Sequence, residues 1–484
     1  MKNFKLIIAI LIFSLSYQSC KEESRDATPP NIVWIMIEDW GYDLSCYGAK
    51  GVYTPNVDRL ASDGIRFTNS FSTGPVCSPS RSAMMTGFHQ NYIGANQHRT
   101  QGEGFVKKEP PNNIKPITEL LREAGYYTCL MVSGKTDLNF TYEKPLFDGK
   151  DWSERSEGQP FFAQVTYAGT HRKWVRDPIR QINIDDVEIP PYYPDTPLTR
   201  RDWANGLESM QVVDRQIGEL LKRLDDENLS DNTLVFLIGD NGRCMPRGKQ
   251  FLYDGGIQVP IIARWPKKIN KGQVNSSMVS TLDVTAAILE AAKIDPGYDL
   301  HGKDILSDEI SDRLYIFAAR DKMDDTFDAM RAIRSRRYKL IHNLMPERPY
   351  CQYNKYKEAS YPVLALLNVL NLKGELTPEQ SLFMAPGKPE FELFDLENDP
   401  FEVNNLYGSE EYSDVFDIML NELEAWRISI NDQGVSYKFK TGGWPATYPT
   451  RSYEEWEDIL ISWQPWVFRE PGDTIQRPKI SSLF

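Results

Sequence analysis

Two unbroken apolar segments that end in acidic residues constrain the fold of this chain more than any other feature of its sequence. Residues 31–37 read Asn-Ile-Val-Trp-Ile-Met-Ile and are followed directly by Glu-Asp. Residues 234–238 read Leu-Val-Phe-Leu-Ile and are followed by Gly-Asp-Asn. Continuous apolar runs of this length are typical of parallel strands that are buried on both faces. The chain is therefore expected to form a mainly parallel sheet that is covered on both sides.

Further strands and helices are expected to alternate along the chain as far as about residue 330. Strand-like apolar runs occupy residues 127–132, 161–167, 260–265 and 314–319. Helical patterns occupy residues 54–61, 117–124, 203–224 and 281–292. Alternating strands and helices are characteristic of an open α/β sheet. We predict an α/β protein with a large mixed, mainly parallel sheet flanked by helices.

The pattern changes near residue 331, and the remaining chain is expected to form a smaller antiparallel subdomain. Its two strand-like segments, residues 338–341 and 391–395, are separated by long stretches that look irregular. The expected organisation is a signal peptide at 1–19, a tether at 20–30, a catalytic α/β domain at 31–330 and a C-terminal subdomain at 331–484.

The N-terminus has the pattern of an export signal. Lys2 and Lys5 precede an apolar run at 6–15, which is too short to span a bilayer but suits the core of a signal peptide. The run ends near Ser19-Cys20, followed by Lys-Glu-Glu, and this resembles a bacterial lipoprotein cleavage site. We expect lipid attachment at Cys20 and an exported protein anchored to the membrane, in the periplasm or at the cell surface. A plain secretory signal with an incidental cysteine is the alternative.

Charge and cysteine spacing exclude several classes of function. Lys and Arg number 55 against 68 Asp and Glu, so the net charge is −13. Nucleic acid is not an expected partner, because binding its backbone requires a basic surface. An anionic substrate would need a local basic pocket, since the overall field of the protein repels it. Apart from Cys20, the cysteines are widely spaced with no CxxC pair, which argues against a zinc ribbon or a disulfide scaffold.

The acidic residues at the two strand ends are candidate metal ligands. Parallel strands end at the same edge of a sheet, and ligands bind beyond that edge. The fold can therefore bring Glu38 and Asp39 close to Asp240 and Asn241. An all-oxygen set without cysteine or histidine suits a hard cation such as Ca²⁺. Acidic residues at strand ends also serve as helix caps or lie in solvated turns, and spacing by itself leaves that interpretation open.

A short motif around Cys77 is the most specific feature of the sequence. Residues 77–81 read Cys-Ser-Pro-Ser-Arg, and Thr-Gly follows at 86–87. This resembles the signature of the type I sulfatases, Cys-x-Pro-x-Arg followed by Thr-Gly. Further matching segments lie along most of the chain, at 30–33, 54–61, 64–67, 239–242, 332–334, 338–340, 392–396 and 398–400. The resemblance, which includes heparan N-sulfatase-like members and bacterial polysaccharide sulfatases, implies the alkaline phosphatase-like sulfatase fold.

The same resemblance implies a modified nucleophile and a metal ion. In that family the cysteine matched by Cys77 is oxidised to formylglycine by a maturation enzyme, and the hydrated aldehyde supplies the nucleophile. One calcium ion is implied, with its ligands falling on Glu38, Asp39, Asp240, Asn241 and the modified Cys77. Glu38 departs from the aspartate usual in the family and is longer by one methylene group. The metal site is expected to persist, with the carboxylate of Glu38 extending slightly further.

Further residues of the family's site can be matched one by one. Arg81 matches the arginine that steadies the formylglycine, and His171 matches the histidine near the leaving group. Lys135 and Lys249 match the two lysines that bind sulfate. Family members commonly have histidine where this chain has Asp137. Either a contributor to sulfate binding is missing, or Asp137 has been given a different role at the substrate.

Two residues after the nucleophile motif are candidate sugar contacts. His98 and Arg99 resemble residues of heparan N-sulfatase-like members. Their other interpretation is that they are packed side chains following a helix.

The resemblance implies sulfate-ester hydrolysis, with sulfamate cleavage as an alternative chemistry. The expected substrate of such an exported protein is a sulfated oligosaccharide or polysaccharide, from algal ulvan or a glycosaminoglycan, attacked at a chain end. A phosphatase or phosphodiesterase of the same superfamily is a weaker alternative, since those sites use several histidines and this chain has five in total. A non-catalytic glycan-binding lipoprotein is a third, and the retained Cys77 and Arg81 argue against it.

Overall fold

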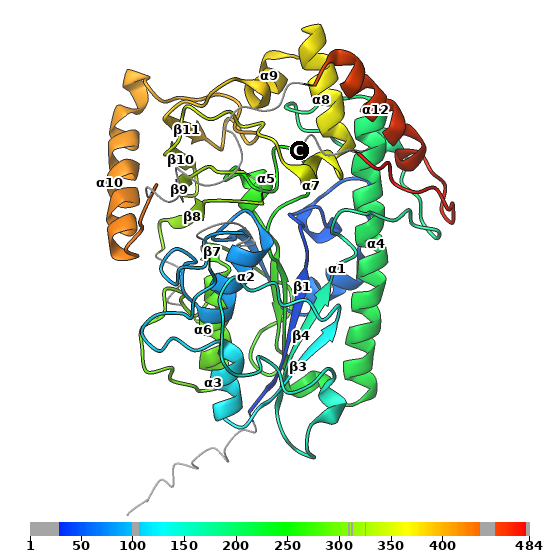
Figure 1. The fold of residues 1–484 in the computed structure, drawn as a ribbon. Coiled ribbons are helices and arrows are strands. Elements are labelled where there is room, and N and C mark those ends of the chain that lie inside the picture. The colour runs from blue at the N-terminus through cyan, green and yellow to red at the C-terminus, as the bar shows by residue number, and fades with distance from the viewer. Residues whose placement is uncertain are drawn as a thin grey trace, which may run out of the picture.

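The computed structural model describes residues 29–98, 106–307, 310, 313–324, 326–435 and 451–480. The signal peptide at 1–19, the lipid site Cys20 and the candidate sugar contact Arg99 lie outside these described residues. Two sheets organise the described chain, one of seven strands and one of four (Figure 1). In this part of the chain every helix is too short or too polar to cross a lipid bilayer.

The large sheet is mixed and mainly parallel, so the predicted fold class is confirmed. Its strand order is β3-β4-β1-β5-β6-β2-β7. The strands are β1 (Asn31–Ile37), β2 (Ile65–Phe71), β3 (Tyr127–Val132), β4 (Phe161–Tyr167), β5 (Thr233–Gly239), β6 (Ile261–Arg264) and β7 (Gln273–Ser280). β6 runs antiparallel to both of its neighbours, and the other pairs are parallel. Every residue of β1, β4 and β5 is buried, as their continuous apolar runs predict.

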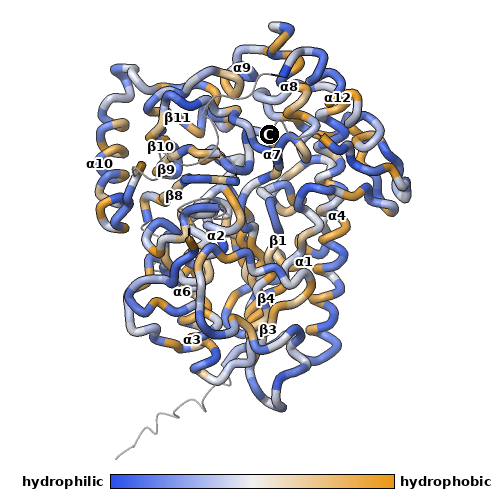
Figure 2. Tube along the Cα trace, in the orientation of Figure 1, coloured by the Kyte–Doolittle hydropathy of each residue, from blue (hydrophilic) through white to orange (hydrophobic). Residues whose placement is uncertain are grey.

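Helices cover both faces of the large sheet (Figure 1). One core contains Val33, Ile35 and Ile37 of β1 together with apolar residues of α1 (Pro55–Ser62) and α4 (Pro197–Asp226). The alternate residues of β1 lie in a second core with the apolar residues of α2 (Cys77–Thr86), α3 (Ile117–Glu123) and α6 (Leu282–Ala291). Along the second half of α4, apolar and polar positions alternate in the way that a helix packed on one side requires, whereas residues 201–211 are all buried (Figure 2).

The small sheet is antiparallel throughout, with the order β11-β10-β9-β8. It comprises β8 (Ile316–Arg320), β9 (Met330–Arg334), β10 (Tyr338–Asn343) and β11 (Phe391–Asp395), and α10 (Ser413–Ser429) packs against it. The strand predicted at 314–319 therefore belongs to this sheet, and its assignment to the large sheet was wrong. The boundary predicted at residue 331 falls inside β9. An apolar run indicates a strand but does not identify its partner.

The stretch between β10 and β11 is helical, which corrects the prediction of irregular structure. It contains α7 (Lys355–Glu358), α8 (Pro362–Lys373) and α9 (Pro378–Met384). The first two turns of α8 are buried on all sides, so their sequence shows no amphipathic period. Towards the C-terminus, α12 (Tyr453–Val467) packs against α8 and α4 (Figure 1). These helices bring the C-terminal part of the chain over the carboxyl edge of the large sheet.

The remaining helical elements are short. They are α5 (Asp254–Ile257) and the single turns η1 (Ser45–Tyr47), η2 (Trp152–Glu154), η3 (Ile184–Asp186), η4 (Ser230–Asn232) and η6 (Glu410–Tyr412).

Candidate functional site

The pairing of β1 with β5 brings the two sets of predicted metal ligands together. Ile37 is in register with Gly239, so the residues that follow each strand are neighbours. The backbone N–H of Asp39 donates to Asp240 Oδ1 at 2.9 Å, and Asn241 Nδ2 donates to Asp39 Oδ1 at 2.9 Å. Asp39 has a φ of 51°, a left-handed conformation that is uncommon for a residue with a side chain and recurs at functional sites.

Cys77 begins α2 and faces this cluster from the other side. Its side chain is fully buried. Its Sγ lies 3.4 Å from Asp39 Oδ1 and 3.2 Å from Lys249 Nζ. After the predicted modification, the hydroxyl oxygens of the hydrated aldehyde would lie close to the position that Sγ has in this structure. A helix N-terminus also favours negative charge at this position.

Arg81 and Lys135, together with Lys249, balance the buried carboxylates. Arg81 lies one turn after Cys77 on the same face of α2. Its Nε donates to Asp240 Oδ2 at 2.8 Å, and its Nη2 lies 3.3 Å from Glu38 Oε1. Lys135 Nζ donates to Glu38 Oε2 at 2.8 Å. The structure thus brings together the residues predicted for the metal and those predicted for the sulfate.

Burial and charge shift the acidity of these groups in different directions. Burial raises the pKa of Glu38 even though Arg81 and Lys135 oppose the effect. Burial would also raise the pKa of Asp39, but Lys249 and His171 outweigh it and hold that pKa well below its ordinary value. For Cys77, burial and then Asp39 raise the pKa of the thiol far above its usual range. Because the thiolate is the reactive form of cysteine, unmodified Cys77 is a poor nucleophile in this setting.

The donor set at the strand ends fits a hard divalent cation. Glu38, Asp39, Asp240 and Asn241 offer only oxygen ligands at the cluster, and all four are buried. Glu38 Oε1 and Asn241 Oδ1 accept no hydrogen bond within the described ranges. Buried oxygens without a donor are the groups that a cation would satisfy. One atom each of Asp39, Cys77 and His171 also lie within 4.8 Å of one another.

His171 follows β4 and lies beside the same cluster. Its Nε2 is 3.4 Å from Asp39 Oδ2 and 3.4 Å from the hydroxyl of Tyr356. Burial lowers the pKa of His171 to about 4, although Asp39 acts in the opposite direction. His171 is therefore neutral near pH 7 in this environment.

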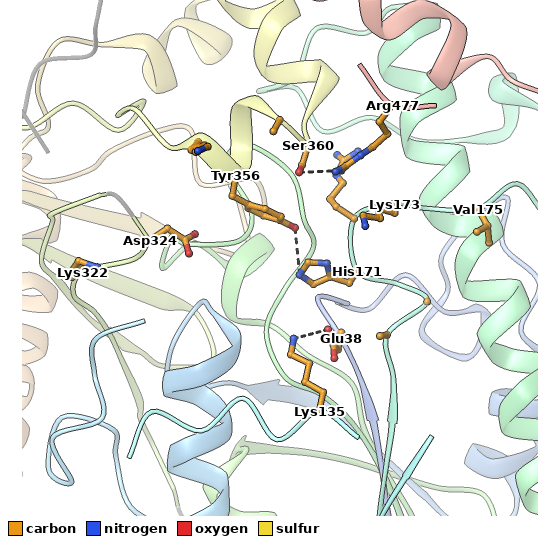
Figure 3. A pocket seen from close by; sticks show the side chains of 15 residues that line it. Glu38, Lys135, His171, Lys173, Val175, Lys322, Asp324, Tyr356, Ser360 and Arg477 are labelled. Carbon is orange, nitrogen blue, oxygen red and sulfur yellow. Dashed lines mark hydrogen bonds and ion pairs between the residues drawn. The ribbon is translucent and has the colours of Figure 1, made fainter. Parts of the chain in front are cut away.

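A cavity of about 870 Å³ opens above these residues (Figure 3). Glu38, Lys135 and His171 lie at one end of it, and Tyr356 lies across from His171. The basic residues of its lining are Lys135, Arg172, Lys173, Lys322, Lys355 and Arg477, and its acidic residues are Glu38 and Asp324. The local basic pocket that an anionic substrate requires in an acidic protein is therefore present.

The remaining predicted site residues occupy different positions. His98 is only 2% exposed and does not line the cavity. Its Nδ1 lies 2.9 Å from Ser78 Oγ and its Nε2 lies 3.2 Å from Asp324 Oδ1, so it braces the residue next to Cys77. Asp137 has a φ of 54° and lies 3.4 Å from Lys135 Nζ. Sugar contact by His98 and a substrate role for Asp137 stay predictions.

Two residues at the site were missed by the analysis of the sequence. Cys244 donates from its thiol to Asp39 Oδ2, and Tyr356 approaches His171 from α7. Cys244 follows Asn241 by three residues in the same loop, and this proximity was an available signal. Tyr356 lies 185 positions from His171, and nothing local in the sequence indicates their contact.

Comparison with known families gives two matches. A family model described as sulfatase matches residues 30–153 and 133–294. A model described as N-sulphoglucosamine sulphohydrolase, C-terminal, matches residues 247–360. The two matches together extend from the start of β1 into α7.

Relatives with assigned activities are similar over most of the chain. An ulvan-active sulfatase of Formosa agariphila is 32% identical over 494 aligned residues, which cover 89% of this chain and 82% of the relative. The N-sulphoglucosamine sulphohydrolase of Homo sapiens is 24% identical and covers 84% of this chain and 92% of the relative.

Solved structures share the fold. A protein in complex with its substrate D-glucosamine-2-N,6-O-disulfate aligns with a TM-score of 0.60 at 18% identity, over 84% of this chain and 99% of that chain. The phosphonate monoester hydrolase of Agrobacterium radiobacter aligns with a TM-score of 0.63 at 17% identity, over 84% of this chain and 97% of that chain. At these identities the likeness concerns the fold alone.

Proposed function

Because this chain belongs to the sulfatase family, we propose that it hydrolyses sulfate esters on oligosaccharides released from a sulfated polysaccharide such as ulvan. The observation that carries the proposal is the position of Cys77 beside the oxygen cluster and beside Lys249. Its Sγ lies within 3.4 Å of Asp39 and within 3.2 Å of Lys249. Lys135 and Lys249 both lie near this residue, and Lys135 also lines the cavity, so we propose that the sulfate binds at this end of it.

Two lysines are placed to hold the sulfate oxygens. Lys249 is buried beside Cys77, and Lys135 reaches the cavity from the segment after β3. Charged donors in a site that excludes water interact strongly with charge that develops in a transition state. We propose that both ammonium groups bind sulfate oxygens while Arg81, held by Asp240, keeps residue 77 in place.

Two groups beyond the twenty amino acids complete the proposed chemistry. A formylglycine formed at position 77 by a maturation enzyme would supply the hydroxyl nucleophile. One Ca²⁺ held by Glu38, Asp39, Asp240 and Asn241 would supply positive charge next to the sulfate oxygens. The all-oxygen donors and their two unsatisfied atoms support this choice of cation.

His171 is placed to serve the leaving group. It lines the cavity, it contacts Asp39, and Tyr356 fixes its ring from the other side. We propose that a sulfate bound beside the ring raises the pKa of His171, and that the protonated imidazole then gives a proton to the oxygen that leaves with the sugar. The chain-end sugar that carries the sulfate would occupy the cavity, which favours exo-action over cleavage within a polymer.

An anchored lipoprotein is compatible with the orientation of the sheet. β1 enters the sheet at Asn31, and the site lies at the opposite end of the strand, after Ile37. We propose export and lipid attachment at Cys20, with a tether that joins the fold at the end of the sheet remote from the cavity. Substrate would then reach the cavity without obstruction by the membrane.

Sulfate release from defined substrates tests the proposed function. The chain, co-expressed with a formylglycine-generating enzyme, is given ulvan oligosaccharides, glycosaminoglycan oligosaccharides, their intact polymers, an N-sulfated glucosamine and a phosphate ester of the same sugar. We expect sulfate, measured by ion chromatography, from oligosaccharide esters first. Release confined to the N-sulfated sugar would assign sulfamate cleavage, and turnover of the phosphate ester alone would overturn the proposal. Cys77→Ala is the inactive control.

A further inference from the structure

The cavity is larger than a sulfate group and carries basic residues far from the sulfate end. A volume of about 870 Å³ lies in the range of pockets that bury whole small-molecule ligands. His171 lies between two groups of charged side chains (Figure 3). Lys135 and Glu38 lie on one side of it, and Lys173 and Arg477 lie on the other. The second group is not used by the proposed reaction.

Among the residues that the structure describes, neither member of the second group is paired with a carboxylate. Lys135 pairs with Glu38, and Arg172 forms a bidentate pair with Asp202 at 2.7 and 2.9 Å. By contrast, no ion pair within the described ranges includes Lys173 or Arg477. Arg477 Nη1 donates to the neutral hydroxyl of Ser360 at 3.3 Å. Burial, and to a smaller extent the nearby Arg172, lower the pKa of Arg477, and Tyr356 acts in the opposite direction.

The backbone presents Lys173 to the cavity in a constrained conformation. Its φ is 118°, which residues with side chains rarely adopt. Its neighbours are fixed, because Trp174 Nε1 donates to Thr170 O at 2.7 Å and the N–H of Val175 donates to Ser209 Oγ at 2.7 Å. Strained backbone held by its surroundings is characteristic of ligand sites.

The C-terminal segment that supplies Arg477 is joined to the loop that supplies Lys173. Arg469 lies at the start of this segment. Its side chain donates to the backbone carbonyl of Trp174, and its own backbone carbonyl accepts a hydrogen bond from the side chain of Arg176. Asn205 of α4 donates to Val467 O at 2.9 Å, at the end of α12. The two segments that carry Lys173 and Arg477 are therefore joined to each other by hydrogen bonds.

We propose that Lys173 and Arg477 form a second anion subsite, which receives a carboxylate or a second sulfate on the oligosaccharide beside the sulfate that is cleaved. The inference rests on the proposed function and narrows it to substrates with at least two anionic groups. A guanidinium recognises carboxylate and sulfate oxygens through paired hydrogen bonds, and an ammonium adds charge without that directionality. The subsite would orient the sugar, so that only a correctly placed substrate brings its sulfate to residue 77.

Three oligosaccharides with the same cleavable sulfate test this subsite. One carries a uronate next to the sulfated sugar, one is its carboxyl-reduced form, and one is the reduced form with a second sulfate. We expect kcat/KM of the wild type to be higher for a dianionic substrate than for the reduced one. Whichever of the two dianionic substrates has the higher kcat/KM identifies the anion that the subsite prefers, carboxylate or sulfate.

Substitutions then locate the preference. Arg477→Gln and Lys173→Gln are each expected to lower the ratio of kcat/KM for the dianionic substrate to kcat/KM for the reduced one, by about tenfold, because a charge-assisted contact with the second anion is lost. Arg477→Lys should retain part of the ratio. Lys479→Gln, on the same segment but outside the cavity lining, is the matched control and should leave the ratio unchanged.

The outcomes separate the two proposals. A loss of activity that is equal for all three substrates, or a ratio that neither variant changes, would overturn the second subsite. If the wild type releases sulfate from none of the three substrates, the proposed function itself fails.

Discussion

Lys249 Nζ lies 2.7 and 2.8 Å from the two carboxylate oxygens of Asp39, and both side chains are buried. The same nitrogen lies 3.2 Å from Cys77 Sγ. A single ammonium group thus joins the end of β1 to the start of α2. Its loss would leave the carboxylate of Asp39 buried without its principal counter-charge.

The Lys249→Met variant is expected to be destabilised by about 3–5 kcal/mol when metal is withheld, because breaking a buried ion pair leaves an uncompensated charge. Added Ca²⁺ should recover part of this loss, since the cation neutralises the same carboxylate. Urea unfolding with and without Ca²⁺ measures both effects. Lys268→Met changes an exposed lysine and should stay within about 0.5 kcal/mol of the wild type. Equal stability of Lys249→Met and the wild type without metal would contradict the argument.

Cys77 is expected to be converted to formylglycine when the chain is made together with a maturation enzyme. Peptide mass spectrometry should find the aldehyde and its hydrate at residue 77, whereas Cys129, which is equally buried but lies outside the motif, remains a cysteine. Cys77→Ala should lose turnover while keeping the unfolding midpoint of the wild type within a few degrees. Fully active protein in which residue 77 is entirely unmodified would refute this expectation.

Metal content is expected to be one Ca²⁺ per chain in active protein. Chelation should lower the unfolding midpoint, and Ca²⁺ should restore it. Asn241→Ala removes one of the unsatisfied oxygens and should weaken calcium binding by at least about tenfold, measured by calorimetry. Asn91→Ala, at a partly buried amide outside the site, provides the control. Two zinc ions per chain would instead favour the phosphatase interpretation.

Acid should destabilise the protein through His301, which lies away from the catalytic cavity. Its Nδ1 accepts a hydrogen bond from the backbone N–H of His89 at 3.2 Å, so this geometry requires the unprotonated nitrogen. Burial lowers the pKa of His301 to about 4. Since the pKa in the unfolded chain is near 6.5, the unfolded state binds more protons between these values.

The stability contributed by neutral His301 is therefore complete above about pH 6.5 and falls as the pH is lowered towards 4. Because the ring is partly exposed, we expect the loss to be about 1–2 kcal/mol. His301→Gln keeps an acceptor and should show a smaller difference in urea midpoint between pH 7 and pH 4.5 than the wild type. An identical difference in both proteins would argue against His301 as the titrating group.

The central strands and the site at their ends could be predicted because the information is local. The bounds of β1, β3, β4 and β11 agree with the apolar runs that predicted them. Burial on both faces removes polar residues from the central strands, and this makes them visible in the sequence. The proximity of the residues after β1 and β5 then follows from the rule that ligands bind beyond the carboxyl ends of parallel strands, whereas the motif at Cys77 was identified by its resemblance to the sulfatase signature.

Partners of the more polar and the fully buried elements could not be predicted in this way. β8 was expected in the large sheet, and it pairs with β9 in the small one. The buried half of α8 has no amphipathic period because it contacts other elements on all sides. Both elements contact residues that are distant in the chain. The local sequence pattern therefore does not indicate which elements they pack against.

By itself, the sequence determined the α/β class, the strands that end in the candidate ligands and the motif that contains Cys77. Only the tertiary structure decided which C-terminal residues complete the cavity, where Tyr356 meets His171 and Arg477 joins Lys173 on its wall. The physical reason is that these contacts link positions far apart in the chain and depend on how α7, α8 and α12 pack over the carboxyl edge of the sheet. The burial of a strand is visible in its apolar composition, whereas a cavity depends on how whole elements pack together.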